Sequence, residues 1–148
     1  MTEGKWKTYL YGFARWAANN SKDSTKVGAA LVGPKLEVRL TAYNGPPRGV
    51  RDTSDRLERP RKYLFASHAE ANLIAFAARA GITTEGCTVF VTHHPCASCA
   101  RTLIQAGVSA IIYGPGTTSM PDEEFEAAAQ MFAEAKIVCE SLADDPVE

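Results

Sequence analysis

The sequence predicts an α/β fold in which helices cover both faces of a mixed, five-stranded sheet. Two observations lead to this class. Short apolar runs alternate along the chain with longer segments whose apolar residues recur every three or four positions, as in amphipathic helices. The expected order is helix, strand, strand, and then helix and strand in turn three times. Each strand–helix–strand unit requires a parallel crossover with its helix packed on the sheet, so we expect a three-layer α/β/α arrangement.

The amino-terminal third is expected to form one helix and one hairpin. Apolar residues spaced by three and four positions indicate an amphipathic helix that begins near Trp6 and ends near Asn19. Apolar runs at 27–32 and 38–43 predict two strands, and Gly33-Pro34 with the residue after it predicts the turn between them. Because this link is short, the two strands are expected to pair antiparallel.

The remaining elements follow a long segment, 44–62, that is rich in glycine and proline and is expected to be irregular. We predict helices over 69–80, 96–106 and 122–135, and strands over 87–92, 108–113 and 137–139. Gly81 and Gly107 are expected to end the first two of these helices. The run Gly114-Pro115-Gly116 is expected to break the chain, and the tail after Ala143 is expected to fray.

Length and composition predict one domain over residues 1–148. The 148 residues are 45% hydrophobic with a net charge of −1, which fits an ordinary globular core. This charge balance does not supply the basic face that a nucleic-acid partner requires. No apolar run approaches the roughly 20 residues that span a bilayer, and no signal peptide is evident. We therefore expect a cytoplasmic protein without membrane contact.

Three metal-binding side chains and one acid form the most informative pattern in the chain. Cys96 and Cys99 are three positions apart at an expected helix start, so they share a face and can bind one ion. His68 and Glu70 are two apart, and on a regular helix they would point about 200° apart. They can serve one site only if His68 lies at the mouth of its helix, for which Ser67 is a plausible N-cap.

One histidine and two cysteines are expected to bind a single Zn²⁺ and to leave its fourth position open, which is typical of a catalytic site. A purely structural zinc would need a fourth ligand, for which His93 and His94 are the candidates, and Glu70 would then have no role. The other two cysteines, Cys87 and Cys139, lie in apolar runs and are expected to be small buried side chains, with all four thiols reduced.

The spacing H-x-E…P-C-x-x-C, here from His68 to Cys99, is a signature of zinc deaminases. Zinc brings the pKa of its bound water toward neutrality. Glu70, which is not a ligand, is expected to take the proton of the water and to pass it to a ring nitrogen and then to the departing ammonia. The expected product carries a carbonyl where the substrate carried an exocyclic amine.

At these residues the chain resembles the cytidine and deoxycytidylate deaminase superfamily, and four further segments favour its deoxycytidylate (dCMP) branch. They are 24–29 (STKVGA), 42–49 (AYNGPPRG), 68–72 (HAEAN) and 104–108 (IQAGV). The resemblance covers the chain from about Trp6 to Tyr113. It implies a cytidine deaminase-like fold and a zinc-dependent hydrolase that converts dCMP, or a modified dCMP, to dUMP and ammonia for thymidylate synthesis.

The resemblance also implies roles for several residues around the zinc. Asn44 would hydrogen-bond the deoxyribose. His94 departs from the family pattern, in which a small or apolar residue is frequent before Pro95. It would lie near the metal and touch the substrate, with an exposed or structural histidine as the alternative. The phosphate would need cations, and Lys26 and the long loop provide them: Arg48, Arg51, Arg56, Arg59, Arg61 and Lys62. A solvated loop of mixed charge is the alternative, because Asp52, Asp55 and Glu58 are interspersed.

Effector and assembly roles rest on the same resemblance. Phe76 and Arg79 fall at helix positions that resemble nucleotide-effector contacts, with Arg48 as a further contact for an effector or a phosphate. Phe76 can equally be a core residue. The expected effectors are dCTP and dTTP, with Mg²⁺ accompanying the nucleotide. A homo-oligomer is also implied, and a hexamer is one of the expected assemblies.

Two other functions remain open at the level of sequence. The same fold could deaminate a tRNA adenosine, a free base such as cytosine or guanine, or a pterin-pathway intermediate. A protein that binds zinc for interaction alone is the third hypothesis, and Glu70→Ala separates it from a catalyst.

Overall fold

The computed structural model describes residues 3–142, and its centre is a five-stranded sheet with the strand order β2-β1-β3-β4-β5. The strands are β1 (Gly28–Val32), β2 (Val38–Tyr43), β3 (Thr88–His93), β4 (Ala110–Gly116) and β5 (Val138–Ser141). β1 pairs antiparallel with both β2 and β3, whereas β4 pairs parallel with β3 and with β5. The predicted mixed sheet and the antiparallel hairpin are therefore confirmed.

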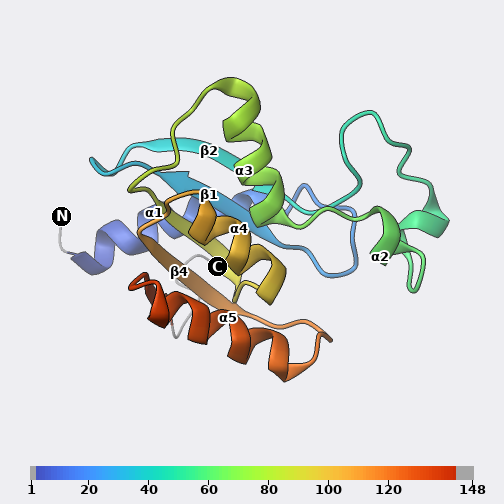
Figure 1. Ribbon diagram of the computed structural model, residues 1–148. Helices are drawn as coiled ribbons and strands as arrows, with labels where there is room; N and C mark the ends of the chain where they lie inside the picture. Colours follow the sequence, from blue (N-terminus) through green and yellow to red (C-terminus); the bar gives the residue numbers. More distant parts are fainter. Residues whose placement is uncertain (1–2, 143–148) are drawn as a thin grey trace.

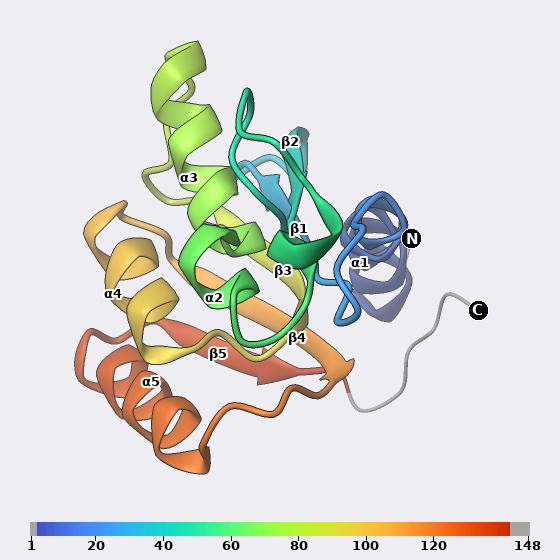
Figure 2. The same cartoon turned by 90° about the vertical axis from the view of Figure 1, so that its right-hand side faces the viewer.

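Helices cover both faces of this sheet (Figures 1 and 2). The long helices are α1 (Glu3–Ala18), α3 (Ala69–Ala80), α4 (Ala97–Gln105) and α5 (Asp122–Glu134). α1 packs alone on one face, while α3, α4 and α5 lie side by side on the other, which confirms the three-layer α/β/α prediction. Within the described residues, no helix combines the length and apolar character needed to cross a membrane.

The sheet has a hydrophobic cluster on each face, which explains why the sequence of β1 is a continuous apolar run. All five of its residues are buried, because alternate side chains point into opposite layers. Ala30 and Val32 pack toward α1 in one cluster, and Ala29 and Leu31 join the larger cluster under the other three helices. Gly28 permits the close approach of α1, since a Cβ there would lie 2.0 Å from the carbonyl oxygen of Ala14.

One predicted boundary is wrong, because β4 continues through Gly114-Pro115-Gly116 instead of breaking there. Proline cannot donate a ladder hydrogen bond. β5, however, pairs with β4 only as far as Tyr113, so Pro115 leaves no bond unmade on that side. The prediction that the tail frays after Ala143 falls outside the described residues.

The segment between β2 and α3 is mostly irregular, as expected, but it contains two short helical turns. They are the 3-10 turn η1 (Ser54–Leu57) and α2 (Lys62–Phe65), which the sequence analysis did not predict. Gly45 and Ser67 exchange two backbone hydrogen bonds of 3.1 and 2.8 Å, which close this segment at its base. The segment therefore leaves and re-enters the domain at one point, directly before α3.

Candidate active site

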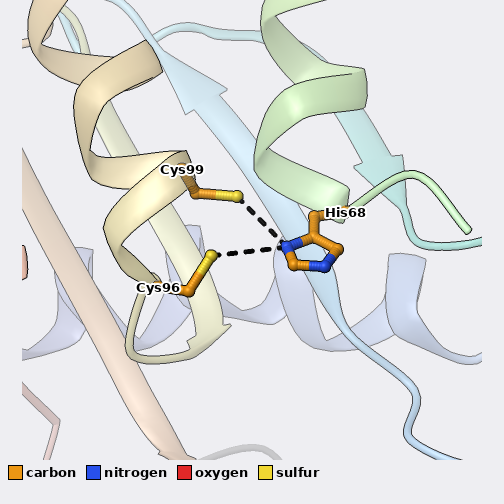
Figure 3. Close-up of side chains that lie close together, drawn as sticks. All are labelled: His68, Cys96 and Cys99. Carbon is orange, nitrogen blue, oxygen red and sulfur yellow. Dashed lines mark hydrogen bonds between the residues drawn. The ribbon is translucent and has the colours of Figure 1, made fainter. Parts of the chain in front are cut away.

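His68, Cys96 and Cys99 meet between the starts of α3 and α4 (Figure 3). The Nδ1 atom of His68 lies 3.5 Å from the Sγ of Cys96 and 3.4 Å from the Sγ of Cys99. All three ligand atoms lie within 4.8 Å of one another, although the residues come from segments about 30 positions apart. The three side chains that the sequence motif selects are therefore brought together by the fold.

The helix boundaries explain how these side chains converge. His68 and Cys96 are the N-cap residues of α3 and α4, and both have extended backbones, with φ/ψ of −70°/153° and −76°/173°. Because His68 precedes the helix, its side chain and that of Glu70 in the first turn are not held to the 200° angle between side chains two positions apart on a regular helix. The cap is therefore His68 itself, one position after the Ser67 that we expected.

Neither N-cap side chain caps its own helix, because both are turned toward the other ligands. For α4 the missing cap is supplied by a neighbour. Glu124 of α5 accepts a 3.1 Å hydrogen bond from the backbone N–H of Ala97, the first residue of α4. A carboxylate at this position also suits the positive end of the helix. α5 thus stabilises the helix start that carries the two cysteines.

The thiols of Cys96 and Cys99 have pKa values shifted in opposite directions. The hydrogen bond from Cys99 lowers the pKa of Cys96 to about 4, with a further contribution from His68. The same hydrogen bond to Cys96, together with burial, raises the pKa of Cys99. The pKa of His68 is raised, chiefly by its hydrogen bond to Cys96. A stable thiolate therefore faces an imidazole, which is the donor chemistry that a soft divalent metal selects.

This donor set fits a zinc ion that retains an open coordination position. Two thiolates and one imidazole are ligands that tetrahedral zinc prefers, and three protein ligands are typical of catalytic centres. Among residues 3–142, neither His93 nor His94 joins the cluster, so the fourth ligand of a structural site is not provided there. Cys87 and Cys139 also lie outside it, as free thiols that are buried and half-buried respectively.

Glu70 lies beside the cluster and in the wall of the same pocket. It is only 5% exposed, and burial raises the pKa of its carboxyl group to about 7. A carboxyl group buried next to three metal ligands, without being one of them, is suitably placed to exchange protons with a bound reactant.

The pocket that opens onto His68 and Glu70 is formed by four parts of the chain. Its walls come from the segment before β1, the loop before α3, the β3–α4 connection and the β4–α5 connection. The polar and aromatic side chains that line it include Asp23, Thr25, Asn44, Arg59, Lys62, Tyr63, His93, His94, Ser119 and Phe125. Asn44 and His94, which the sequence analysis assigned to the substrate, are both among them.

Asn44 has a clear structural role in this wall. Its Oδ1 accepts a 3.0 Å hydrogen bond from the backbone N–H of Val27, and its Nδ2 donates to the carbonyl of Thr25 at 2.8 Å. A side-chain amide can donate twice and accept twice. Asn44 therefore ties the start of β1 to the end of β2 and retains one donor and one acceptor position for a ligand.

His94 is held as an aromatic wall. Its ring packs edge-on against Tyr113 and Phe125, with centroid distances of 4.6 and 5.8 Å. Its Nδ1 lies 2.8 Å from the carbonyl of Pro95, and its Nε2 lies 3.9 Å from the thiol of Cys139. Both ring nitrogens thus face the protein, so the surface that His94 presents to the pocket is chiefly its ring.

Several other residues that the sequence analysis named lie away from this pocket. Lys26 lines a second cavity on the far side of His93, together with Arg15. Arg48 places its guanidinium 4.8 Å from the ring centroid of Phe76, and Arg79 is exposed in the last turn of α3. Phe76 also packs against the core, which is one of the two roles considered for it, and its role as an effector contact stays a prediction.

Sequence reasoning did not single out several of the pocket walls. Asp23 and Lys62 form a buried ion pair with an Oδ1–Nζ distance of 2.8 Å, and Phe125 comes from α5. Arg59 and Lys62 were two of the six loop cations, among which the sequence did not distinguish. Asp23 and Arg59 lie in irregular segments and Lys62 begins a four-residue helix, so no periodicity or motif spacing marks them.

With the fold, the three-ligand cluster and its neighbouring acid, the chain has the features of a zinc-dependent hydrolytic deaminase. It belongs to the cytidine and deoxycytidylate deaminase family, whose zinc-binding region matches residues 4–115.

Individual relatives agree with this family. The chain is 39% identical over 138 residues to an uncharacterized deaminase of Aliivibrio fischeri, with 90% of each chain covered. It is 33% identical over 118 residues to the deoxycytidylate deaminase of Mus musculus, covering 74% of this chain but 64% of the mouse protein, slightly less than two thirds. The dCMP deaminase of cyanophage S-TIM5, solved with dCMP and dUMP, has the same fold, with a TM-score of 0.77, 23% identity and coverage of 96% and 99%.

Proposed function

We propose that this chain hydrolyses dCMP, or a modified dCMP, to dUMP and ammonia, and so supplies thymidylate synthesis. The observation that carries the proposal is the buried Glu70 beside the convergence of His68, Cys96 and Cys99 in a pocket. Similarity to deoxycytidylate deaminases supports the choice of dCMP over other amines.

In this proposal His68, Cys96 and Cys99 would hold one Zn²⁺, which would supply a bound water of lowered pKa as the nucleophile. Glu70 takes a proton from that water and transfers it to the ring nitrogen next to the reacting carbon. It then carries a second proton to the exocyclic amine as the C–N bond breaks. One water is consumed and one ammonia leaves, so the amino group is replaced by a carbonyl oxygen.

Asn44 and His94 orient the substrate in the proposed complex. The free donor and acceptor positions of the Asn44 amide suit a sugar hydroxyl group, and its two backbone hydrogen bonds fix its direction. The His94 ring, which packs on Tyr113 and Phe125, provides a rigid apolar wall for the base. Both contacts position the amine carbon near Glu70.

The substrate assignment is tested by ammonia release from dCMP, cytidine, cytosine, guanine and dCTP with zinc-loaded protein. We expect dCMP to give the highest kcat/KM of the five. Turnover of a free base with none of dCMP would contradict the proposal. Inosine in the tRNA of expressing cells, absent when Glu70 is replaced, would instead favour a tRNA adenosine deaminase.

Regulation and assembly are part of the same proposal. Arg48 stacks on Phe76 of α3, and Arg79 lies in the last turn of the same helix. We propose these three residues as contacts for dCTP or dTTP with Mg²⁺ in a homo-oligomer such as a hexamer. The role of Lys26 in binding the substrate stays a prediction. A soluble nucleotide substrate and four free thiols support a cytoplasmic location. Light scattering with and without dCTP tests the assembly and its response to the nucleotide.

A further inference from the structure

Arg59 bridges two loops at the pocket. Its Nε donates a 2.6 Å hydrogen bond to the hydroxyl of Tyr63 in α2, and its Nη2 lies 3.4 Å from the hydroxyl of Ser119 in the β4–α5 connection. All three residues line the pocket that contains His68 and Glu70. A cation and two hydroxyl groups, from loops 60 residues apart, therefore converge at one wall of the proposed active site.

The charge of Arg59 is not neutralised by a neighbouring acid. Among residues 3–142, no carboxylate lies within ion-pair distance of its guanidinium, and both of its partners are neutral hydroxyl groups. Lys62, which also lines the pocket, is instead paired with Asp23 at 2.8 Å, and the two side chains are 6% and 5% exposed. Arg59 is thus the described pocket cation whose charge is available to an anionic ligand.

Three other cations of the long loop are engaged elsewhere. Arg61 pairs with Asp55 at 3.0 Å, and Arg56 stacks on Phe65 and donates to a backbone carbonyl. Arg48 stacks on Phe76. None of these three guanidinium groups lines the pocket, whereas Arg59 does.

The donor count at Arg59 suits a phosphate. A guanidinium has five N–H donors, and the two used for Tyr63 and Ser119 leave three for a ligand. The hydroxyl group of Tyr63 accepts from Arg59, so it retains its own proton to donate. Planar, charge-assisted donation of this kind is the usual way in which proteins select phosphate oxygens.

We infer that Arg59, with Tyr63 and Ser119, binds the 5′-phosphate of the substrate and makes the enzyme prefer a nucleotide to its nucleoside. This inference rests on the proposed function, because it assumes that a cytosine nucleotide occupies the pocket. It assigns the phosphate to one cation out of the six loop cations that the sequence alone leaves equivalent. Arg59 acts in binding, and the proton transfers stay with Glu70.

The test compares dCMP with deoxycytidine, which lacks only the phosphate. Arg59→Gln is expected to lower kcat/KM for dCMP about 30- to 100-fold, because a charge-assisted contact is lost. Its kcat/KM for deoxycytidine should stay within threefold of wild type, which also shows that the active site is intact. Tyr63→Phe and Ser119→Ala should each lower kcat/KM for dCMP about three- to tenfold.

The matched control is Arg61→Gln, two positions away, exposed, and paired with Asp55 outside the pocket. Both substrates should keep their wild-type kcat/KM within threefold in this variant. Calorimetry with dUMP and deoxyuridine gives a readout independent of turnover, and only dUMP should bind more weakly to the Arg59 variant.

The outcomes separate the two proposals. A wild type that prefers dCMP, combined with an Arg59 variant that keeps this preference, overturns the phosphate assignment alone. Equal losses on dCMP and deoxycytidine also overturn it, because they would indicate a general disturbance of the pocket. A wild type that does not distinguish dCMP from deoxycytidine, or turns over neither, contradicts the proposed function and its phosphate site together.

Discussion

His68 and Cys96 occupy equivalent positions in two different helices, each as the N-cap residue with an extended backbone, and their Nδ1 and Sγ atoms are 3.5 Å apart. The positive ends of α3 and α4 therefore meet at one point. Thiolates and a carboxylate are favoured at such a junction, because helix N-termini stabilise negative charge. The arrangement binds a metal without using either side chain to cap its own helix.

Replacing one thiolate should release the metal. Cys99→Ala is expected to lower the zinc content from one ion per chain to near zero and to abolish deamination, because two ligands hold zinc poorly. Mass spectrometry of the dialysed protein measures the metal. The matched control is Cys87→Ala, in which a fully buried thiol outside the cluster is removed and zinc content should be unchanged. Equal zinc in both variants would exclude Cys99 as a ligand.

Asn44→Ala should affect both stability and substrate binding. The variant leaves the backbone N–H of Val27 and the carbonyl of Thr25 without partners, at a cost of about 1–3 kcal/mol for each group. Urea unfolding measures this loss, and steady-state kinetics at a temperature where the variant is folded should show KM rising more than kcat falls. Asn20→Ala, an exposed amide, is the control and should change neither. An unchanged KM for dCMP would remove Asn44 from the substrate site.

Lys62→Met should be strongly destabilising, because it leaves the carboxylate of Asp23 buried without its cation. Breaking a buried pair in this way costs about 3–5 kcal/mol. Lys22→Met is the control, because it removes an ion pair of similar geometry at the surface. The Nζ of Lys22 lies 2.6 Å from the carboxylate of Asp52, and the two side chains are 69% and 48% exposed. This control variant should leave the urea midpoint unchanged.

The double variant Asp23→Asn/Lys62→Met should recover part of the lost stability, since it removes the unpaired charge. Equal midpoints for Lys62→Met and Lys22→Met would show that burial of the pair contributes nothing to the fold.

The regular elements could be predicted because local signals and tertiary packing agree there. The observed bounds of α3 and β2 match the predicted ones, since Gly81 adopts the left-handed conformation expected of a helix end, with φ of 70°. Gly114-Pro115-Gly116 misled the prediction because its strand conformation depends on where β5 stops, which is a tertiary fact. α2 was missed because four residues carry no periodicity.

The site divides in the same way. His68, Glu70, Cys96 and Cys99 could be selected from sequence, because the geometry of zinc requires these residue types near helix starts. The residues of the pocket wall could not be selected from sequence, because Arg59 and Lys62 lie close together in the chain and differ only in what they contact. Lys26 precedes β1 in sequence, yet its side chain lines the second cavity behind His93.

Glu70→Gln provides the most direct test of the proposed catalytic site, because it removes a proton carrier while preserving the size of a buried side chain. The variant should keep one zinc per chain and lose about 10²- to 10⁴-fold or more in kcat for dCMP. Zinc content and ammonia release are to be measured on the same preparation. Retained zinc with wild-type kcat would contradict the role of Glu70 and with it the assignment of this pocket as a deaminase site.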